Sequence, residues 1–470
     1  MSTEAASLSH WPLDGLLARL QPDALSAELE ELRAESEALA DWAISPGDAP
    51  WKTLLARYLA LDERFEALSS IVHLAHRQRR QSERVLRAEQ ALAKQGLHLH
   101  RQTAPLVEAW RRKARKQKHR RDACPMQLEW LKALDRLDRA AVDDPQQTAL
   151  MRLLAEGWHH VMSASPVGPD EQGLGRLAEL LQTRVEADQR CSESGWPPSL
   201  HRWGALNDVD FQVLDTWTDS HAESGMPAYA RALQRGAGLS RCDLKTFRDL
   251  ERRSMAIPRL DDVQAVKLVL TALGDIDPQG ARLVRKLVRD GRLAFRPASE
   301  LALCIDTPCG AYVSLSYQPD LNGLMLLAHE LGHAVQYEKR RAEGRGHIPL
   351  TTVASEAAAL SAERALVLWL VARGEPWATP ARQYLTAQTL EMDHRHRMLS
   401  QFELGLYQLP ELTVASISAH WLELNRRFYG ATIQFDPGFA TAWSELHHLF
   451  TAPWYLLAYP LAMQRFRASS

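Results

Sequence analysis

The sequence predicts a mostly helical protein with more than one lobe. Apolar residues recur at three- and four-residue spacing up to about residue 200, and again from Asp243 onward. Strand-like alternation is confined to one stretch, 301–321. With 470 residues, the chain is long enough for two or three lobes around a large core. We place a soft boundary near residue 200, which gives an N-terminal helical domain at 1–200 and a second domain at 201–470.

The composition excludes several classes of protein. Hydrophobic residues make up 46% of the chain and charged residues 24%, as in ordinary globular proteins. The formal net charge is −2, so no global field favours nucleic acid or an anionic membrane. No apolar run approaches the ~20 residues of a membrane span, and the N-terminus lacks the basic start and apolar core of a signal peptide. Because five cysteines, an odd number, suit free thiols in a reducing compartment, we expect a cytoplasmic protein.

The N-terminal half reads as successive helices. Residues 24–43 and most of 51–95 carry helical periodicity. The most basic run, 110–121, is either a phosphate-binding patch or a solvated helix face or loop that could steer acidic peptides. Because it has no interleaved aromatic residues, we favour the second interpretation and expect no nucleic-acid partner.

Beyond residue 200 the helical signal returns after a less regular stretch. Gly and Pro punctuate loops between 160 and 225. Helices are then expected within 244–291, with Asp261 or Asp262, and Asp277, as starts or caps. The alternating stretch 301–321 follows, and it predicts a small β element, either a structural hairpin or an edge strand that holds an extended ligand.

A five-residue motif directly after this β element carries the chemistry. His329, Glu330 and His333 lie in an apolar run without proline from Leu321 to Arg341, which predicts one helix. Histidines four residues apart project from one helix face and can hold one metal ion. Glu330 can reach a water on that metal without being a ligand, which is the zincin arrangement.

A catalytic zinc usually needs a third protein ligand and an open position for water. A third histidine six residues after His333 is absent, since that position is Lys339. A second helix is expected after the glycines and proline of 344–349, capped by Thr351 or Thr352. Its first ligand candidate is Glu356, and Glu363 follows seven residues later on the same face.

The HELGH motif followed by SEAAALSAE resembles the M3 metallopeptidases, the group of thimet oligopeptidase and oligoendopeptidase F. The resemblance implies a mostly α, multi-helical, two-lobed zincin-type metallopeptidase with a deep channel. It implies one zinc per chain held by His329, His333 and Glu356, with Glu330 as general base. We expect Glu363 to orient a ligand histidine. Cobalt and manganese suit the same ligands, although zinc suits them best.

Further segments extend the resemblance. Gly310, Ala311 and Tyr312 look like the family's Gly-Ala-Tyr substrate element, although the connection to the HELGH helix is compressed here. QFELGLY at 401–407 and RRFYG at 426–430 also resemble the family, as does a tryptophan followed five residues later by His448.

The family's histidine and tyrosine stabilise the oxyanion, a role in which a positioned donor lowers the barrier. The resemblance assigns it here to His448 and to Tyr455 or Tyr459, because leucines stand at 456 and 457 where the family often has tyrosine. The family's further C-terminal helices have no counterpart, so we expect a member shortened at its C-terminus.

The sequence therefore predicts a zinc endopeptidase that hydrolyses short or unfolded peptides. The alternative is a peptide-binding or peptide-maturation partner on a peptidase scaffold with weak or no turnover. The compressed β region and the two leucines favour the alternative, whereas the intact motif with Glu330 and both later glutamates favours the enzyme. The pattern leaves the oligomeric state and the cleavage preference open.

Overall fold

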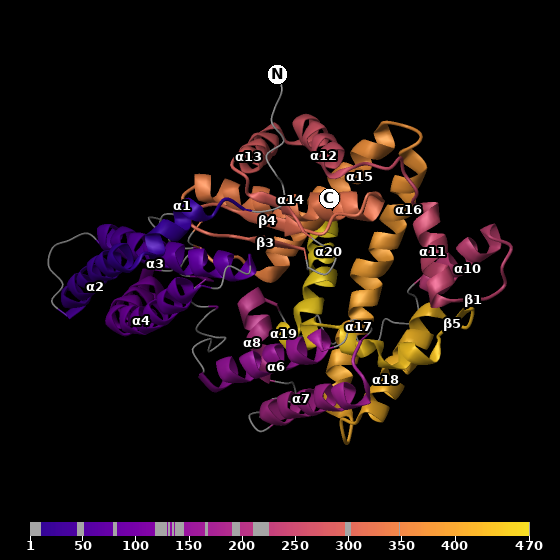
Figure 1. Ribbon diagram of the computed structural model, residues 1–470, viewed down its shortest axis with the longest axis horizontal. Helices are drawn as coiled ribbons and strands as arrows, with labels where there is room; N and C mark the ends of the chain where they lie inside the picture. Colours follow the sequence, from indigo (N-terminus) through magenta and orange to yellow (C-terminus); the bar gives the residue numbers. More distant parts are fainter. Residues whose placement is uncertain are drawn as a thin grey trace. The chain divides into compact units, whose positions relative to one another are not determined.

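The computed structural model is built almost entirely of helices (Figure 1), as the sequence predicts. Its described residues are 11–44, 51–78, 82–117, 129, 132–133, 136, 145–164, 168–189, 198–209, 225–296, 302–346 and 348–469. The basic run at 110–121 lies mostly outside the described side chains. Two compact units emerge, each made of two stretches of sequence. The first combines Met1–Ala133 with Leu260–Pro349, and the second combines Leu134–Arg259 with Leu350–Ser470.

The first unit contains the N-terminal helices, a small sheet and the helix of the HELGH motif. Its described elements are α1 (Asp14–Leu17), η1 (Ala18–Leu20), α2 (Pro22–Ile44), α3 (Trp51–Arg77), α4 (Glu83–Gln117), α12 (Asp262–Ile276), α13 (Pro278–Arg289), β2 (Leu293–Phe295), β3 (Leu303–Ile305), β4 (Tyr312–Leu315) and α14 (Leu321–Ala342). Helices α2, α3 and α4 lie alongside one another (Figure 1). Asp261 and Asp277 cap α12 and α13, as two of the expected caps.

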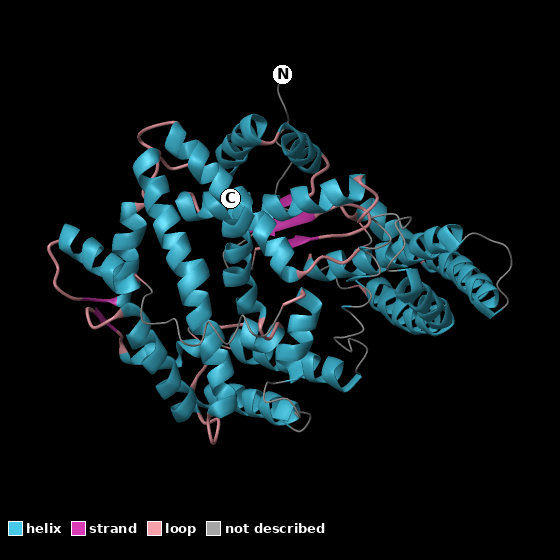
Figure 2. Cartoon of the chain, turned by 180° about the vertical axis from the view of Figure 1, so that it is seen from behind, coloured by secondary structure: helices cyan, strands magenta, loops and turns pink. Residues whose placement is uncertain are grey.

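The sheet of this unit has three strands, drawn in magenta in Figure 2, in the order β2-β4-β3. Strand β4 pairs in parallel with β2 and antiparallel with β3. All four residues of β4 are buried, as expected for a central strand covered on both faces. Strand β2 was not expected, because three residues after a helix are too few to show a period. Helix α14 packs against β3 and β4.

The N-terminal segment is joined to this sheet by Trp11. Its indole Nε1 donates to the carbonyl of Val313 at 3.0 Å, and its ring meets Tyr312 edge to face at 5.5 Å. Trp11 is 1% exposed. A buried indole with a hydrogen-bond acceptor contributes buried apolar area and also fixes the orientation of its ring. This contact therefore holds Trp11 against the central strand.

The second unit is helical apart from one short strand pair. Its described elements are α6 (Pro145–Ser163), α7 (Glu171–Gln189), α8 (Pro198–Asn207), α10 (Met226–Gly236), β1 (Cys242–Asp243), α11 (Leu244–Ser254), α15 (Thr352–Ala372), α16 (Ala378–Thr389), η3 (Leu390–Arg395, a π-helix), α17 (His396–Gly405), η4 (Leu406–Gln408), α18 (Val414–Tyr429), β5 (Ile433–Gln434), η5 (Pro437–Glu445), α19 (His448–Thr451), η6 (Tyr455–Leu457) and α20 (Ala458–Ser469). Helix α15 packs along α20 and α16.

Large aromatic side chains fill the core of the second unit. Trp421 and Phe402 meet edge to face at 5.2 Å, and both are almost fully buried. Trp443 is also buried and donates its indole hydrogen to Ser418. This core joins α6 and α7 to α17 and α18, so segments far apart in sequence support one another.

The compact units do not show which parts of the chain fold independently, so the expected domain boundary near residue 200 stays a prediction. Among the described helices, none combines the length and the apolar character needed to cross a bilayer.

Candidate metal centre

Helix α14 presents the two histidines of the motif. Asp320 caps the start of this helix, and its side chain accepts a hydrogen bond from the Gly323 amide at 2.9 Å. A β-carbon at Gly323 would lie 2.0 Å from the carbonyl oxygen of Gln318, so only glycine permits this tight entry to the helix. The rings of His329 and His333 lie on one face with their centroids 4.8 Å apart, as the four-residue spacing predicts.

Helix α15 carries the carboxylate. Its first residues are fixed by Thr351, whose hydroxyl oxygen accepts from the Ala354 amide at 3.1 Å, and by Asn207, which accepts from the Val353 amide. Thr351 is therefore the cap, one of the two expected. Glu356, just over one turn into the helix, is 2% exposed.

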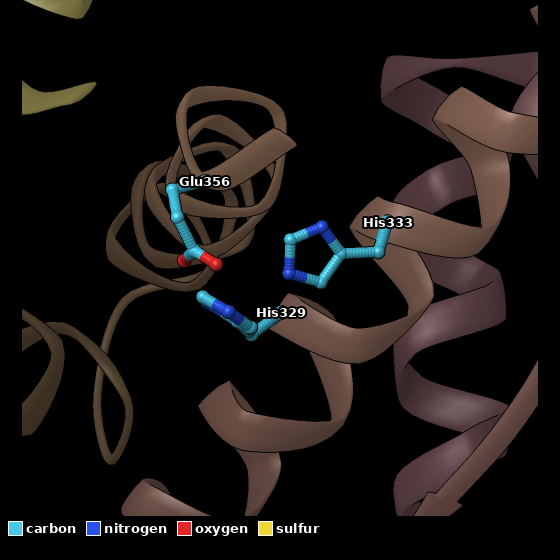
Figure 3. A group of neighbouring side chains, drawn as sticks. All are labelled: His329, His333 and Glu356. Carbon is cyan, nitrogen blue, oxygen red and sulfur yellow. The ribbon is translucent and has the colours of Figure 1, made fainter. Parts of the chain in front are cut away.

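His329, His333 and Glu356 form the one potential metal-binding group found among the described residues. One ligand atom from each lies within 4.8 Å of the others. Figure 3 shows the Glu356 carboxylate directed toward the two imidazole rings. Two imidazole nitrogens and one carboxylate oxygen are the ligand set of catalytic zinc sites with an open position. The donor set therefore fits zinc.

Glu330 lies next to His329 on α14 and is 6% exposed. Burial first, and then the negative charge of Glu330, raise the pKa of the Cys304 thiol. Glu330 thus stands next to a candidate ligand histidine, as the glutamate of the zincin motif does.

His448 and Tyr455 lie together beside the carboxylate ligand. The Tyr455 hydroxyl donates to Glu356 Oε1 at 2.6 Å. The ring of His448 stacks on that of Tyr455 at 4.9 Å, nearly parallel. Burial, with the nearby His447 and His396, lowers the pKa of His448 to about 3. A neutral imidazole keeps one N–H to donate at neutral pH.

Tyr459 lies farther along the same segment. Its ring meets that of Tyr455 at 5.8 Å and that of His396 at 4.4 Å. His396 is 8% exposed, and its Nδ1 lies 2.7 Å from the carbonyl oxygen of Glu391 in the π-helix η3. Sequence reasoning missed His396, although π-helical turns often mark functional positions; that turn is not visible in the sequence pattern.

Glu363 is held by two side chains that the sequence analysis did not single out. Its Oε2 accepts from the Tyr384 hydroxyl and from Gln388 Nε2, both at 2.6 Å. Both donors come from α16, four residues apart. Burial and the Glu363 charge raise the pKa of Tyr384 well above its usual value, so this hydroxyl stays a donor. Only the helical spacing of Tyr384 and Gln388 hints at a shared face in the sequence.

The Gly-Ala-Tyr element is already engaged within its own unit. The Gly310 amide donates to the Thr307 carbonyl, and the Ala311 amide donates to Glu338 at 3.0 Å. Tyr312 pairs with Ile305 of β3 and is 5% exposed. These residues lie at the start of the central strand, whereas β3 is an edge of the described sheet. The substrate role of the element stays a prediction, and the edges of the described sheet are β2 and β3.

Several solved structures share this fold. A provisionally assigned peptidase from Chlamydophila abortus matches 98% of this chain and 88% of its own, with a TM-score of 0.65 and 15% identity. A provisionally assigned oligoendopeptidase F from Bacillus anthracis matches 94% and 86%, with a TM-score of 0.58 and 12% identity. PZ peptidase A, crystallised with an inhibitor, matches 94% and 87%, with a TM-score of 0.57 and 14% identity. No family model and no curated protein matches the sequence. The chain thus has the fold of these peptidases.

Proposed function

We propose that this protein is a zinc-dependent endopeptidase that hydrolyses short or unfolded peptides. The observation that carries the proposal is the convergence of His329, His333 and Glu356 within 4.8 Å, with Glu330 beside them on α14. The shared fold with peptidases supports it at the level of architecture. When bound, zinc would polarise the scissile carbonyl and lower the pKa of a bound water toward ~7.

The residues of this chain divide the remaining work. Glu330 takes a proton from the attacking water and passes it to the leaving amine, the part of a general base and then a general acid. The Tyr455 hydroxyl, which donates to Glu356 in this structure, turns its one hydrogen to the oxyanion, and the neutral His448 imidazole is a second donor, because negative charge develops on that oxygen. Glu363 of α15 orients a ligand histidine.

An extended peptide would add to the edge strand β3. Such addition satisfies the backbone groups of both chains and leaves alternate side chains to set specificity. Because α14, the helix of Glu330, packs against β3, a peptide paired with β3 would run beside the helix that carries the general base.

Peptide cleavage with matched variants tests the proposal. The zinc-loaded protein is incubated with a mixed library of short peptides, and products are identified by mass spectrometry. Glu330→Gln removes the base without removing a ligand, so it should keep one zinc and lose most turnover. Glu343→Gln, an exposed change at the end of the same helix, is the control and should cleave normally. Cleavage that persists in Glu330→Gln would refute the general-base role.

Chelation supplies an independent measurement. Removal of zinc should abolish cleavage, and re-addition should restore it. A wild-type protein that holds one zinc but cuts no peptide in the library would instead indicate a peptide-binding partner on a peptidase scaffold.

A further inference from the structure

A buried ion pair anchors the segment that carries His448 and Tyr455. Arg184 of α7 and Glu403 of α17 lie 2.6 Å apart, with side chains 3% and 0% exposed. Arg184 also donates to the carbonyl of Leu449 at 2.9 Å, and Glu403 accepts from the Trp454 amide at 2.9 Å. Leu449 directly follows His448, and Trp454 directly precedes Tyr455. The pair therefore holds the backbone next to both residues.

The backbone is strained at Trp454, the residue whose amide Glu403 holds. This residue has φ 66° and ψ 0°, the left-handed region, which bulky side chains rarely adopt. Such a conformation persists only when the surroundings over-determine it, and it recurs at functional sites. This backbone conformation sets the direction of the chain at the next residue, Tyr455.

The Trp454 side chain is fixed from several sides. Its Nε1 donates to Ser199 at 2.7 Å, and Ser199 in turn donates to Asp188. Its ring stacks on Tyr407 at 5.6 Å, and Arg184 lies 5.1 Å from the ring centroid. Trp454 is 1% exposed. These contacts come from α7, α8 and η4, so three further elements determine one residue.

We propose that Arg184 and Glu403 are positioning residues for the reaction, because they fix the backbone on which His448 and Tyr455 are carried. The inference rests on the proposed function, in which those two side chains donate to the oxyanion. Neither member of the pair needs to meet the substrate. A displacement of about 1 Å in a donor costs about 100-fold in rate, so the pair acts on turnover and not on peptide binding.

The test replaces the pair as a unit. Arg184→Met with Glu403→Leu exchanges a buried ion pair for apolar side chains of similar size, which often leaves stability unchanged. The probe is the library peptide that the wild-type protein cuts fastest. We expect one zinc per chain, an unchanged KM and a kcat about 100-fold lower. Arg248→Met with Glu251→Leu is the control, a less buried ion pair of the same unit whose Arg248 contacts Tyr429 and Glu391 instead of the segment of His448 and Tyr455.

A milder variant keeps the test decisive if the double variant fails to fold. Arg184→Lys keeps the positive charge opposite Glu403 and replaces by one nitrogen the two guanidinium nitrogens that donate separately to Glu403 and to the Leu449 carbonyl. A lower kcat at unchanged KM and zinc content supports the inference, in either variant. A folded double variant with the wild-type kcat, or an Arg184→Lys protein with the wild-type kcat, overturns it.

Failure of the proposed function gives a different result. A wild-type protein that holds zinc but cuts no peptide refutes the peptidase, and the positioning role falls with it. An active wild-type protein with an equally active double variant refutes the positioning role alone.

Discussion

The hydroxyl of Tyr455 donates a 2.6 Å hydrogen bond to Glu356 Oε1. One residue thus touches the carboxylate that completes the candidate metal site and stacks on His448. Since the hydroxyl has one hydrogen, it can donate either to Glu356 or, once released from it, to an oxygen that develops charge nearby. This contact separates Tyr455 from Tyr459, which the sequence alone left as equal alternatives.

The first prediction compares these two tyrosines. Tyr455→Phe removes the donor and keeps the ring, so we expect zinc to stay bound and kcat to fall about 10²-fold. Tyr459→Phe serves as the control, since its ring packs on His396, and it should retain most of the wild-type kcat. Steady-state kinetics on one peptide measures both. A larger loss in Tyr459→Phe would exchange the two assignments.

The second prediction concerns Glu363 and its donors. If Glu363 orients a ligand histidine, Glu363→Ala should weaken zinc binding by about 10- to 100-fold. The change also leaves Tyr384 and Gln388 without their buried acceptor, which costs about 1–3 kcal/mol in the free energy of unfolding. Zinc affinity is measured by competition with a chelator, and stability by urea denaturation.

Tyr384→Phe separates the two effects. It removes one donor to Glu363 and should cost about 1 kcal/mol of stability, with a small change in zinc affinity. Unchanged zinc binding in Glu363→Ala, despite lower stability, would leave Glu363 a structural residue.

Much of the fold could be predicted because helices leave a periodic apolar pattern and capping residues in the sequence. The unbroken apolar run from Leu321 predicted α14 almost to its last residue, and the aspartates and Thr351 predicted caps. Strand β2 was not predicted, because a strand of three residues is too short to show an alternating pattern. The grouping of the chain into two units, each from two distant stretches, also escaped, since a local pattern holds no information on which helices meet.

The candidate site divides in the same way. His329, His333 and Glu356 follow from spacing within two helices, and the structure brings them together. Tyr384, His396 and the Arg184–Glu403 pair contribute through tertiary contacts between residues up to 265 positions apart. Single residues at such separations have no motif, so their roles follow only from the packed structure.

The third prediction is a pH dependence of stability at Asp62 in α3. Burial, with the negative charge of Glu66, raises the pKa of Asp62 to about 6 from an ordinary 3.8. The folded state therefore binds this proton more tightly than the unfolded state, and the contribution to stability falls as pH rises from about 4 to about 6. Above that range, the buried charge destabilises the fold.

Asp62→Asn removes this penalty. We expect a gain of about 1 kcal/mol at pH 7.5, discounted because the side chain is partly exposed, and little change at pH 4. Urea midpoints at the two pH values measure it. Glu63→Gln, an exposed neighbour, is the control, with a change within about 0.5 kcal/mol. An equal gain at both pH values would rule out ionisation of Asp62 as the cause.

The fourth prediction concerns Glu338, which joins α14 to the start of β4. It accepts from the Ala311 amide at 3.0 Å and from Arg292, whose side chain is 8% exposed. Burial acts to raise the pKa of Glu338, but hydrogen bonds from Arg292 and Ala311 prevail and lower it. A lowered pKa in the folded state means stability that is present above the ordinary value of 4.5 and lost as pH falls.

Glu338→Gln keeps one acceptor oxygen and removes the charge. We expect a loss of about 2 kcal/mol at pH 7, because the buried charge of Arg292 loses its closer ionised partner and keeps only Asp290, at 3.4 Å. The difference from wild type should shrink as the pH falls through the lowered pKa of Glu338, because the wild-type carboxylate itself then becomes protonated. Urea denaturation at pH 7 and at pH 3.5 measures both, with Glu343→Gln as the exposed control on the same helix. A deficit of the same size at both pH values would mean that shape, and not charge, makes Glu338 stabilising, since only the ionised form can lose its advantage in acid.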